Sequence, residues 1–304
     1  MKTLCCLVVL SCALTSVAAE GEKYALRYKF HPGETLRWEV EHRSNVRTTI
    51  SGTTQNAETV SNSVKVWRVK DVRPDGSATF EHSVESVDMR QQLSGRAEVR
   101  YNSRTDAKPP VGFEDVAKSV GVPLSIVTMN PKGKILERKR REAGKLANVD
   151  FKIPAPNEGC MTIPLPDEVV QVGHTWTTPQ DIDIPLQTGG VKKIKAVQRF
   201  TLEEVRTGVA TIRVATEIIT PVTDPAIESQ LVQRESAGRV RFDIDAGRII
   251  GQQMDVDKHV VGFRGDASSI HYLNRFCEQI ILDGLNTAER AGKAVLGIMR
   301  KAGV

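Results

Sequence analysis

The residues that come closest to a catalytic set lie near the carboxyl end of the chain. Asp266, Ser268, Ser269 and His271 supply the residue types of an orienting carboxylate, a nucleophile and a general base. Neighbours in sequence do not make a triad, because its members must meet through the fold. Neither serine stands in a Gly-x-Ser-x-Gly turn, and the sequence offers no oxyanion-hole loop. We therefore expect ordinary surface and strand residues here, and we predict no catalytic residue.

Asp243 and Asp245 are the one calcium candidate, because the run Asp-Ile-Asp-Ala-Gly begins like an acidic calcium loop. Calcium prefers six or more oxygen ligands, usually including a distal bidentate glutamate. Here Gly247 follows too early, and Met254 stands near the place of the distal ligand. Strand alternation instead predicts Asp243 as a solvent-facing strand residue and Asp245 as a turn former. We therefore predict no metal site.

Other cofactors and nucleic-acid partners are not expected either. The six histidines are scattered singly, so no zinc-binding spacing exists, and the chain has no phosphate-binding glycine loop or dinucleotide motif. The net charge is only +5, and the densest basic run, residues 138–141, lies between Glu137 and Glu142. Such a mixed run is typical of a solvated linker, not of a nucleic-acid site.

The N-terminus predicts export. Lys2 precedes an apolar run at residues 4–14, and small residues follow at 15–19. A basic residue, an apolar core too short to span a bilayer and small residues at a cut site define a secretory signal peptide. We predict cleavage after Ala19, with residues 1–19 as the signal, and a mature protein in the periplasm or outside the cell. After that point, no segment has the apolar length of a transmembrane helix.

The cysteines leave two separate questions open. The first is whether Cys12 is the lipidated residue of a lipoprotein, so that the mature chain begins there, instead of after Ala19. The other concerns Cys160 and Cys277, the remaining thiols of a mature chain in an oxidising compartment. They either form one disulfide or remain separate and partly buried, which is the default for two cysteines so far apart.

The elements that carry these residues are predominantly β-strands. The clearest is a hairpin over residues 239–254, in which apolar residues alternate on both sides of a turn at Asp245-Ala246-Gly247. Gly247 suits the positive φ that closes a short hairpin loop. A similar pattern occurs at residues 126–136, and Asp75-Gly76 indicates another hairpin. Residues 51–63 are either an extended edge or a long loop, and residues 268–282 are either a strand or a helix.

The order of these patterns repeats, which predicts a duplicated β-rich unit. In each half, strands precede a short helix and a glycine-turn hairpin, with the helices at Phe113–Val120 and Pro225–Arg234. We predict a mainly β protein of two related antiparallel curved-sheet lobes, each with a short helix, plus a C-terminal helix. The predicted units are a first repeat at 20–136, a linker at 137–166, a second repeat at 167–284 and a helical tail at 285–304.

Four segments resemble a known protein family: Phe30–Trp38, Lys108–Ala117, Val170–Trp176 and Phe242–Arg248. They are similar to a family of secreted, uncharacterised β-rich proteins of planctomycete-type bacteria, a domain of unknown function. The resemblance covers most of residues 24–282. It implies export and an antiparallel β architecture, but that family has no established activity, so it assigns no functional residue.

These features favour a non-catalytic exported protein. Curved sheets of this size commonly enclose a cavity or present a concave face, so we predict binding of an apolar ligand or a cell-envelope component in a β-sheet cavity or cleft. The alternative is a structural or assembly protein of the cell envelope that acts through sheet edges and the C-terminal helix. A serine hydrolase centred on Ser268 or Ser269 is the third hypothesis.

Overall fold

The computed structural model describes residues 21–140, 162–186 and 189–282. The predicted signal, the helical tail, Cys12 and Cys160 therefore lie outside the described residues. The described chain is mainly β, as predicted, with two short helices, α1 (Glu114–Ser119) and α2 (Pro225–Leu231). Its strands are β1 (Thr35–Ile50), β2 (Thr53–Val72), β3 (Ala78–Leu93), β4 (Val99–Asn102), β5 (Pro123–Met129), β6 (Ile135–Arg140), β7 (Thr175–Pro185), β8 (Val191–Arg206), β9 (Val209–Ile218), β10 (Ala237–Asp243), β11 (Arg248–Val261) and β12 (Ser269–Ile280).

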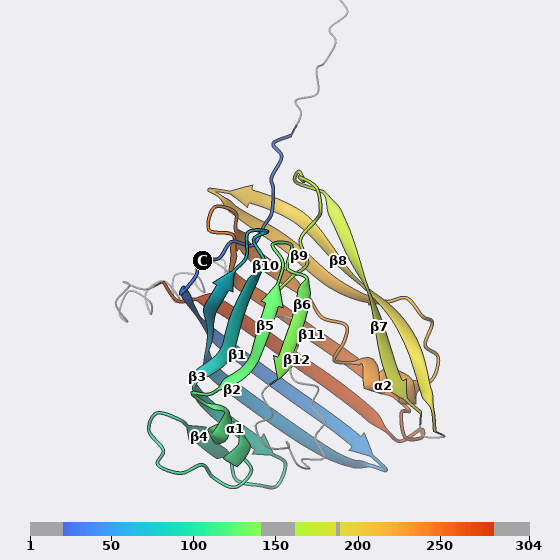
Figure 1. The fold of residues 1–304 in the computed structure, drawn as a ribbon. Coiled ribbons are helices and arrows are strands. Elements are labelled where there is room, and N and C mark those ends of the chain that lie inside the picture. The colour runs from blue at the N-terminus through green and yellow to red at the C-terminus, as the bar shows by residue number, and fades with distance from the viewer. Residues whose placement is uncertain (1–20, 141–161, 187–188, 283–304) are drawn as a thin grey trace, which may run out of the picture.

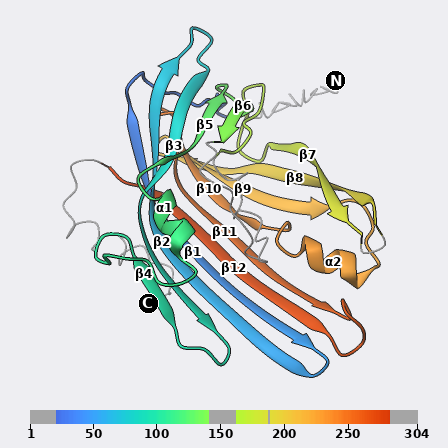
Figure 2. The ribbon, with the colours of Figure 1, turned by 60° about the horizontal axis from the view of Figure 1, so that its bottom comes forward.

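All of these strands belong to one open, curved antiparallel sheet (Figures 1 and 2). The strand order is β6-β5-β3-β2-β1-β12-β11-β10-β9-β8-β7, and β4 pairs additionally with β3. In each half of the chain, strands precede a short helix and a hairpin: four strands precede α1 in the first half, and three precede α2 in the second. Strand β12 then joins the halves by pairing with both β1 and β11. The first and last strands of the described chain are thus central neighbours.

Several local predictions are confirmed, and two ambiguities are resolved. The turn at Asp245–Gly247 joins β10 to β11, and Gly247 has a φ of 61°. Residues 53–63 belong to the long strand β2, and residues 269–280 form β12 instead of a helix. The region predicted as a linker, residues 137–166, departs from that prediction at both ends. Strand β6 extends to Arg140, and Ile163 and Leu165 pack in the core.

The main core lies on one face of the sheet, where its curvature brings strands of the two halves together. Trp38 of β1 and Phe80 of β3 are packed in the same cluster as Phe200 of β8 and Phe242 of β10. Trp67 stacks on Phe80 with ring centroids 4.3 Å apart. Burial of large aromatic and aliphatic side chains from distant strands is the main force that holds this curvature.

An extended N-terminal segment, residues 24–30, runs through this core and links the β5–β6 hairpin to the β10–β11 hairpin. The backbone N–H of Tyr28 donates to Pro131 O (2.7 Å), and the backbone N–H of Lys29 donates to Gly247 O (2.9 Å). The Tyr28 hydroxyl also accepts from Ile163 N (3.0 Å), and burial raises the pKa of Tyr28 well above its ordinary value. The segment therefore contacts the turn after β5 and the turn after β10 at once.

Both helices cover the face of the sheet that carries the main core. Phe113, just before α1, packs with Val87 of β3 and Tyr101 of β4. Ile227 and Leu231 of α2 pack against isoleucines of β7 and β8. The start of α2 follows from its sequence, because Asp224 accepts from Ala226 N (2.8 Å) and Pro225 occupies the first turn. Neither described helix has the length and apolar character needed to span a bilayer.

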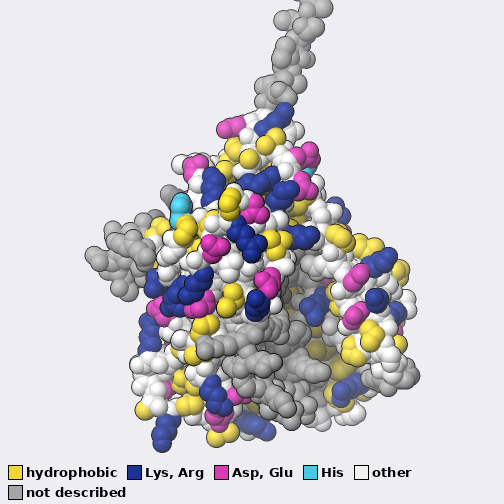
Figure 3. All heavy atoms as spheres, viewed as in Figure 1, with side chains coloured by type: hydrophobic (Ala, Val, Ile, Leu, Met, Phe, Trp, Pro, Cys, Tyr) yellow, Lys and Arg dark blue, Asp and Glu magenta, His cyan; other side chains and the backbone are white. Residues whose placement is uncertain are grey.

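Among the described strands, β6 and β7 form the two edges of the sheet, and both resist further pairing. Strand β7 contains Pro179 and Pro185 as well as Asp181 and Asp183, and β6 ends in the charged run Glu-Arg-Lys-Arg. Proline and charge on an edge strand oppose strand addition. Positive and negative side chains are also interspersed over the surface that Figure 3 shows. The described edges therefore do not favour assembly through the sheet.

Candidate functional site

The structure distributes the four residues of the catalytic candidate over a turn and a strand. The Ser268 hydroxyl accepts from Arg264 N and donates to Gly265 O, both at 2.7 Å, inside the turn between β11 and β12. Ser268 is 2% exposed, so a substrate cannot reach it. His271 Nε2 lies 2.8 Å from an oxygen of Asp257 on β11, whereas Asp266 is an exposed turn residue. The hydroxyl of Ser268 is thus used to shape a turn, and Ser268 is buried instead of being the surface residue that the sequence suggested.

The calcium candidate is also a turn. The Asp243 carboxylate accepts from Ala246 N (2.8 Å), so it caps the loop instead of facing solvent as a plain strand residue. The Lys29 ammonium lies 3.3 Å from Ile244 O and 3.1 Å from Asp245 O. A lysine already donates to the carbonyls that a cation would use. Within the described ranges, no group of three or more His, Cys, Asp or Glu side chains is arranged to hold a metal ion.

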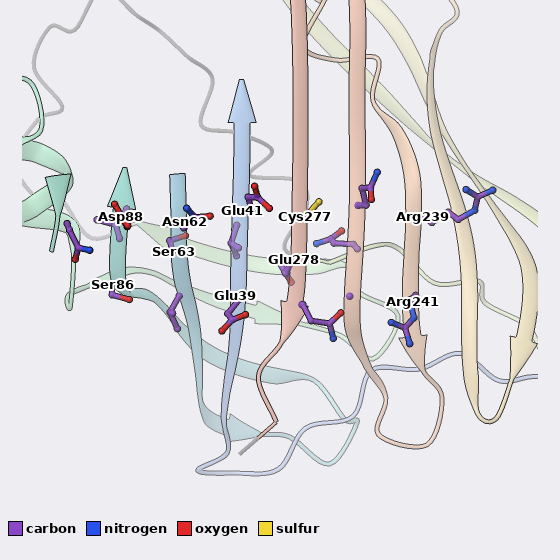
Figure 4. A pocket seen from close by; sticks show the side chains of 18 of the residues that line it. Glu39, Glu41, Asn62, Ser63, Ser86, Asp88, Arg239, Arg241, Cys277 and Glu278 are labelled. Carbon is purple, nitrogen blue, oxygen red and sulfur yellow. The ribbon is translucent and has the colours of Figure 1, made fainter. Parts of the chain in front are cut away.

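A hollow of about 800 Å3 lies across the centre of the sheet (Figure 4). Its lining comes mainly from β3, β2, β1, β12, β11 and β10. Because side chains alternate along a strand, Glu39 and Glu41 lie on the face opposite Trp38, and Arg241 lies opposite Val240. The hollow therefore opens on the polar face of the sheet, with the main core beneath it.

Strand register arranges the lining as two neighbouring rows that cross the sheet. The paired positions of the first row run Ser86, Val64, Glu39, Gln279, Gly251 and Arg241. The paired positions of the second run Asp88, Asn62, Glu41, Cys277, Gln253 and Arg239. Figure 4 accordingly shows acidic side chains on the β3 to β1 side and arginines on the β10 side. The hollow has an acidic wall, a basic wall and a floor of amide, thiol and glycine groups.

Charges at the rim of this hollow differ in whether they are paired. Glu41 is paired with Arg43, and the Arg239 guanidinium lies 2.8 Å from Glu203. By contrast, in the part of the chain that the structure describes, the side chains of Glu39 and Asp88 and of Arg241 have no ion-pair partner. All three are exposed. The hollow therefore presents uncompensated charge of both signs.

Directly beneath the floor, on the core face, lies a buried ion pair. Lys65 Nζ of β2 is 2.6 Å from Glu278 Oε2 of β12, and the two side chains are 10% and 2% exposed. The same ammonium lies 4.6 Å from the centroid of the Trp38 ring and 5.0 Å from that of Trp67. Aromatic faces favour a desolvated cation. The pair joins β2, in the first half of the chain, to β12.

His82 of β3 stands beside this pair and gives the fold a predicted pH dependence. Burial, followed by the positive charges of Lys65 and Arg138, lowers the pKa of His82 to about 4. An unfolded chain would protonate His82 near its ordinary value of about 6.5, so the unfolded state binds the proton first as the pH falls. The contribution of His82 to the free energy of unfolding is present in full above about pH 6.5 and is lost as the pH falls from about 6.5 to 4.

We expect that loss to reach about 3 kcal/mol for His82 alone. Urea unfolding of the wild type and of His82→Gln at pH 7.5 and pH 4.0 measures it, because carboxylate contributions cancel between the two proteins. The variant should lose less stability than the wild type on acidification. Equal losses in both proteins would show that His82 is not the group responsible.

The sequence patterns predict that these lining residues face solvent, but they do not predict that the residues lie in one hollow. Glu39 and Glu41 alternate with Trp38, and Arg239 and Arg241 alternate with Val240, so each run predicts an ordinary exposed strand face. What brings them to one hollow is the pairing of β1 with β12 and of β11 with β10. No local signal in the sequence specifies the first of these pairings.

Comparisons with known proteins do not assign a function to this chain. No family model matches it, and no curated protein matches its sequence. One similar solved structure, of lipid–protein interactions in lipovitellin, has a TM-score of 0.41 and 10% identity and covers 84% of this chain. This chain spans about a quarter (26%) of that lipovitellin chain. Another, DynF from the dynemicin biosynthesis pathway of Micromonospora chersina, has a TM-score of 0.23 and 8% identity, with coverage of 91% of this chain and 94% of that one. At these TM-scores neither likeness carries an argument about function.

Proposed function

We propose that this is an exported, non-catalytic binding protein that holds a component of the cell envelope in the hollow on the polar face of its sheet. The observation that carries the proposal is the hollow itself, about 800 Å3 in size and rimmed by unpaired charges of both signs. A cavity of this size is typical of sites for small ligands. Export rests on the predicted signal at residues 1–19 and places the hollow where envelope components are found.

Of the two ligand classes predicted from the sequence, the lining favours an envelope component with polar and charged groups. Charged side chains at the rim and amide groups on the floor need partners of matching polarity. In the main core, a void near Trp38 and Trp67 measures about 10 Å3, which is roughly the space of one water molecule. Any apolar portion of the ligand would contact Val64 in the wall of the hollow.

We also propose that the two halves are related lobes of one duplicated unit. In both, strands precede a short helix and a hairpin, with the short β4 as an additional strand in the first half. In both, the turn of that final hairpin accepts a hydrogen bond from the N-terminal segment, through Pro131 O and through Gly247 O. A shared element order and a shared contact support duplication more strongly than similar strand patterns alone.

A co-purification experiment tests the binding function. The exported protein is isolated from its native envelope, and bound molecules are identified by mass spectrometry. We expect a polar, charged envelope molecule in about a one-to-one ratio. Asn62→Trp places a large side chain in the hollow and should remove it, because an exposed strand position accepts tryptophan.

The matched control is Thr177→Trp, an exposed position on edge strand β7 that does not line the hollow. It should retain the bound molecule at the wild-type ratio. Absence of any bound envelope molecule, or equal retention by both variants, would refute binding in the hollow.

A further inference from the structure

We infer that the hollow binds a short linear peptide of about four residues in extended form, with its free amino group at Glu39 and its free carboxylate at Arg241. This inference rests on the proposed function and names the class of ligand. It follows from three properties of the described lining: which charges are unpaired, how far apart they are, and what lies between them.

The first property is the contrast between paired and unpaired charges on one face. Neighbouring charges on the polar face are paired, as in Arg275 with Asp255 (2.6 Å) and Arg37 with Glu85 (2.9 Å). Within the described chain, Glu39 and Arg241 lack such partners. Asp88 is likewise unpaired and adds negative charge near Glu39, and Arg104, in the turn after β4, also lines the hollow. A ligand that carries one cationic and one anionic group would complement Glu39 and Arg241.

The second property is distance. Glu39 and Arg241 belong to the same cross-strand row, with only Gln279 of β12 and Gly251 of β11 between them. Three strand spacings of about 4.8 Å separate their backbones by roughly 14 Å. An extended peptide advances about 3.3–3.6 Å per residue, so about four residues span this gap. A single amino acid, whose two charges lie on one residue, spans only a fraction of this backbone separation.

The third property is the chemistry of the floor. Side-chain amides donate and accept hydrogen bonds as peptide groups do, and Asn62, Gln253 and Gln279 place such amides in the hollow. The Nε2 atoms of the two glutamines already donate to Asp255 (2.7 Å) and to Ile250 O (2.7 Å), which leaves their oxygens to accept from peptide N–H groups. Gly251 contributes no side chain to the floor. The peptide would cross the strands, so no edge strand is needed.

Calorimetric titration of the full-length mature protein with tetraalanine tests the inference. We expect one-site binding, and we expect N-acetylation or C-terminal amidation of the peptide each to weaken it about tenfold, because each removes a charge-assisted contact. Alanine as the free amino acid should not bind measurably at the same concentrations.

Two variants assign the ends of the peptide. Glu39→Gln should weaken the binding of tetraalanine about tenfold but leave the binding of N-acetyl-tetraalanine unchanged. Arg241→Gln should also weaken the binding of tetraalanine about tenfold but leave the binding of the C-terminally amidated peptide unchanged. Glu217→Gln, which alters an exposed pair with Arg199 outside the hollow, is the matched control and should bind as the wild type. Both test positions are exposed, so circular dichroism should show an unchanged fold.

Two results would overturn the peptide ligand. One is failure of tetraalanine to bind, and the other is binding that ignores both end modifications or both variants. If Asn62→Trp nevertheless removed a co-purifying molecule of another kind, the proposed binding function would stand and only the peptide class would fall. If neither tetraalanine nor any envelope molecule bound, both would fall.

Discussion

Replacing Glu278 with leucine is expected to lower the free energy of unfolding by about 3–5 kcal/mol. The change leaves the Lys65 ammonium without its partner in a site that is 10% exposed and walled by Trp38 and Trp67. The ammonium is then buried without a counter-charge, which costs free energy in the folded state only, because water solvates Lys65 in the unfolded chain. Equilibrium unfolding in urea measures the difference.

The double variant Lys65→Met, Glu278→Leu should recover most of that loss, because it removes both charges and keeps similar side-chain volumes. Glu217→Gln is the surface comparison: its partner Arg199 is 45% exposed, so we expect a loss below about 1 kcal/mol. If Glu278→Leu cost no more than Glu217→Gln, the buried pair would not be a structural link between β2 and β12.

Replacing Gly133 with alanine is expected to cost about 3 kcal/mol or more, in two parts. Its φ of 82° strains any residue with a Cβ, at about 1–2 kcal/mol. In addition, the new Cβ would lie 2.3 Å from Ile163 O and 2.7 Å from a ring carbon of Tyr28, so the core must shift. Overpacking of this kind typically costs a further 1–3 kcal/mol or so.

Gly52→Ala separates the two parts. Gly52 has nearly the same φ, 79°, but an added Cβ there would meet no atom within 4 Å. We expect it to show only the backbone strain, about 1–2 kcal/mol, in the same denaturation experiment. Equal losses for the two variants would mean that the close approach of the N-terminal segment to Gly133 contributes nothing to stability.

The two turn glycines show how far the sequence reaches. Positive φ at the turns was predictable from the Asp-Ala-Gly and Pro-Lys-Gly patterns between alternating strands. The second reason for glycine was not predictable. At Gly247 a Cβ would lie 2.6 Å from Lys29 N, and at Gly133 it would meet the ring of Tyr28. Both turns pack against a segment more than 100 residues away in the sequence, and no local pattern encodes that contact.

The region between the halves shows a different limit. Its prolines and charges predicted a linker at residues 137–166, yet Ile163 and Leu165 are each 5% exposed and belong to the main core. The run 162–165 makes contacts with Tyr28 and Trp176 that satisfy its backbone, through Ile163 N and O and through Pro164 O. Irregular backbone is buried here because side chains from other segments supply its hydrogen bonds.

The sequence by itself determined the local features of this protein: the alternating strands, the glycine turns, both short helices and the polar character of one strand face. Each depends on residues within a few positions of one another, where steric and hydrogen-bonding preferences act directly. Tertiary structure decided which strands are neighbours when they do not belong to the same hairpin. Pairing of β1 with β12 places Glu39 beside Gln279 on one face and Lys65 with Glu278 beneath it. The hollow, with unpaired charges on its two opposite walls, exists only because of that register. Cross-strand neighbours are set by burial of the whole core and not by any single strand.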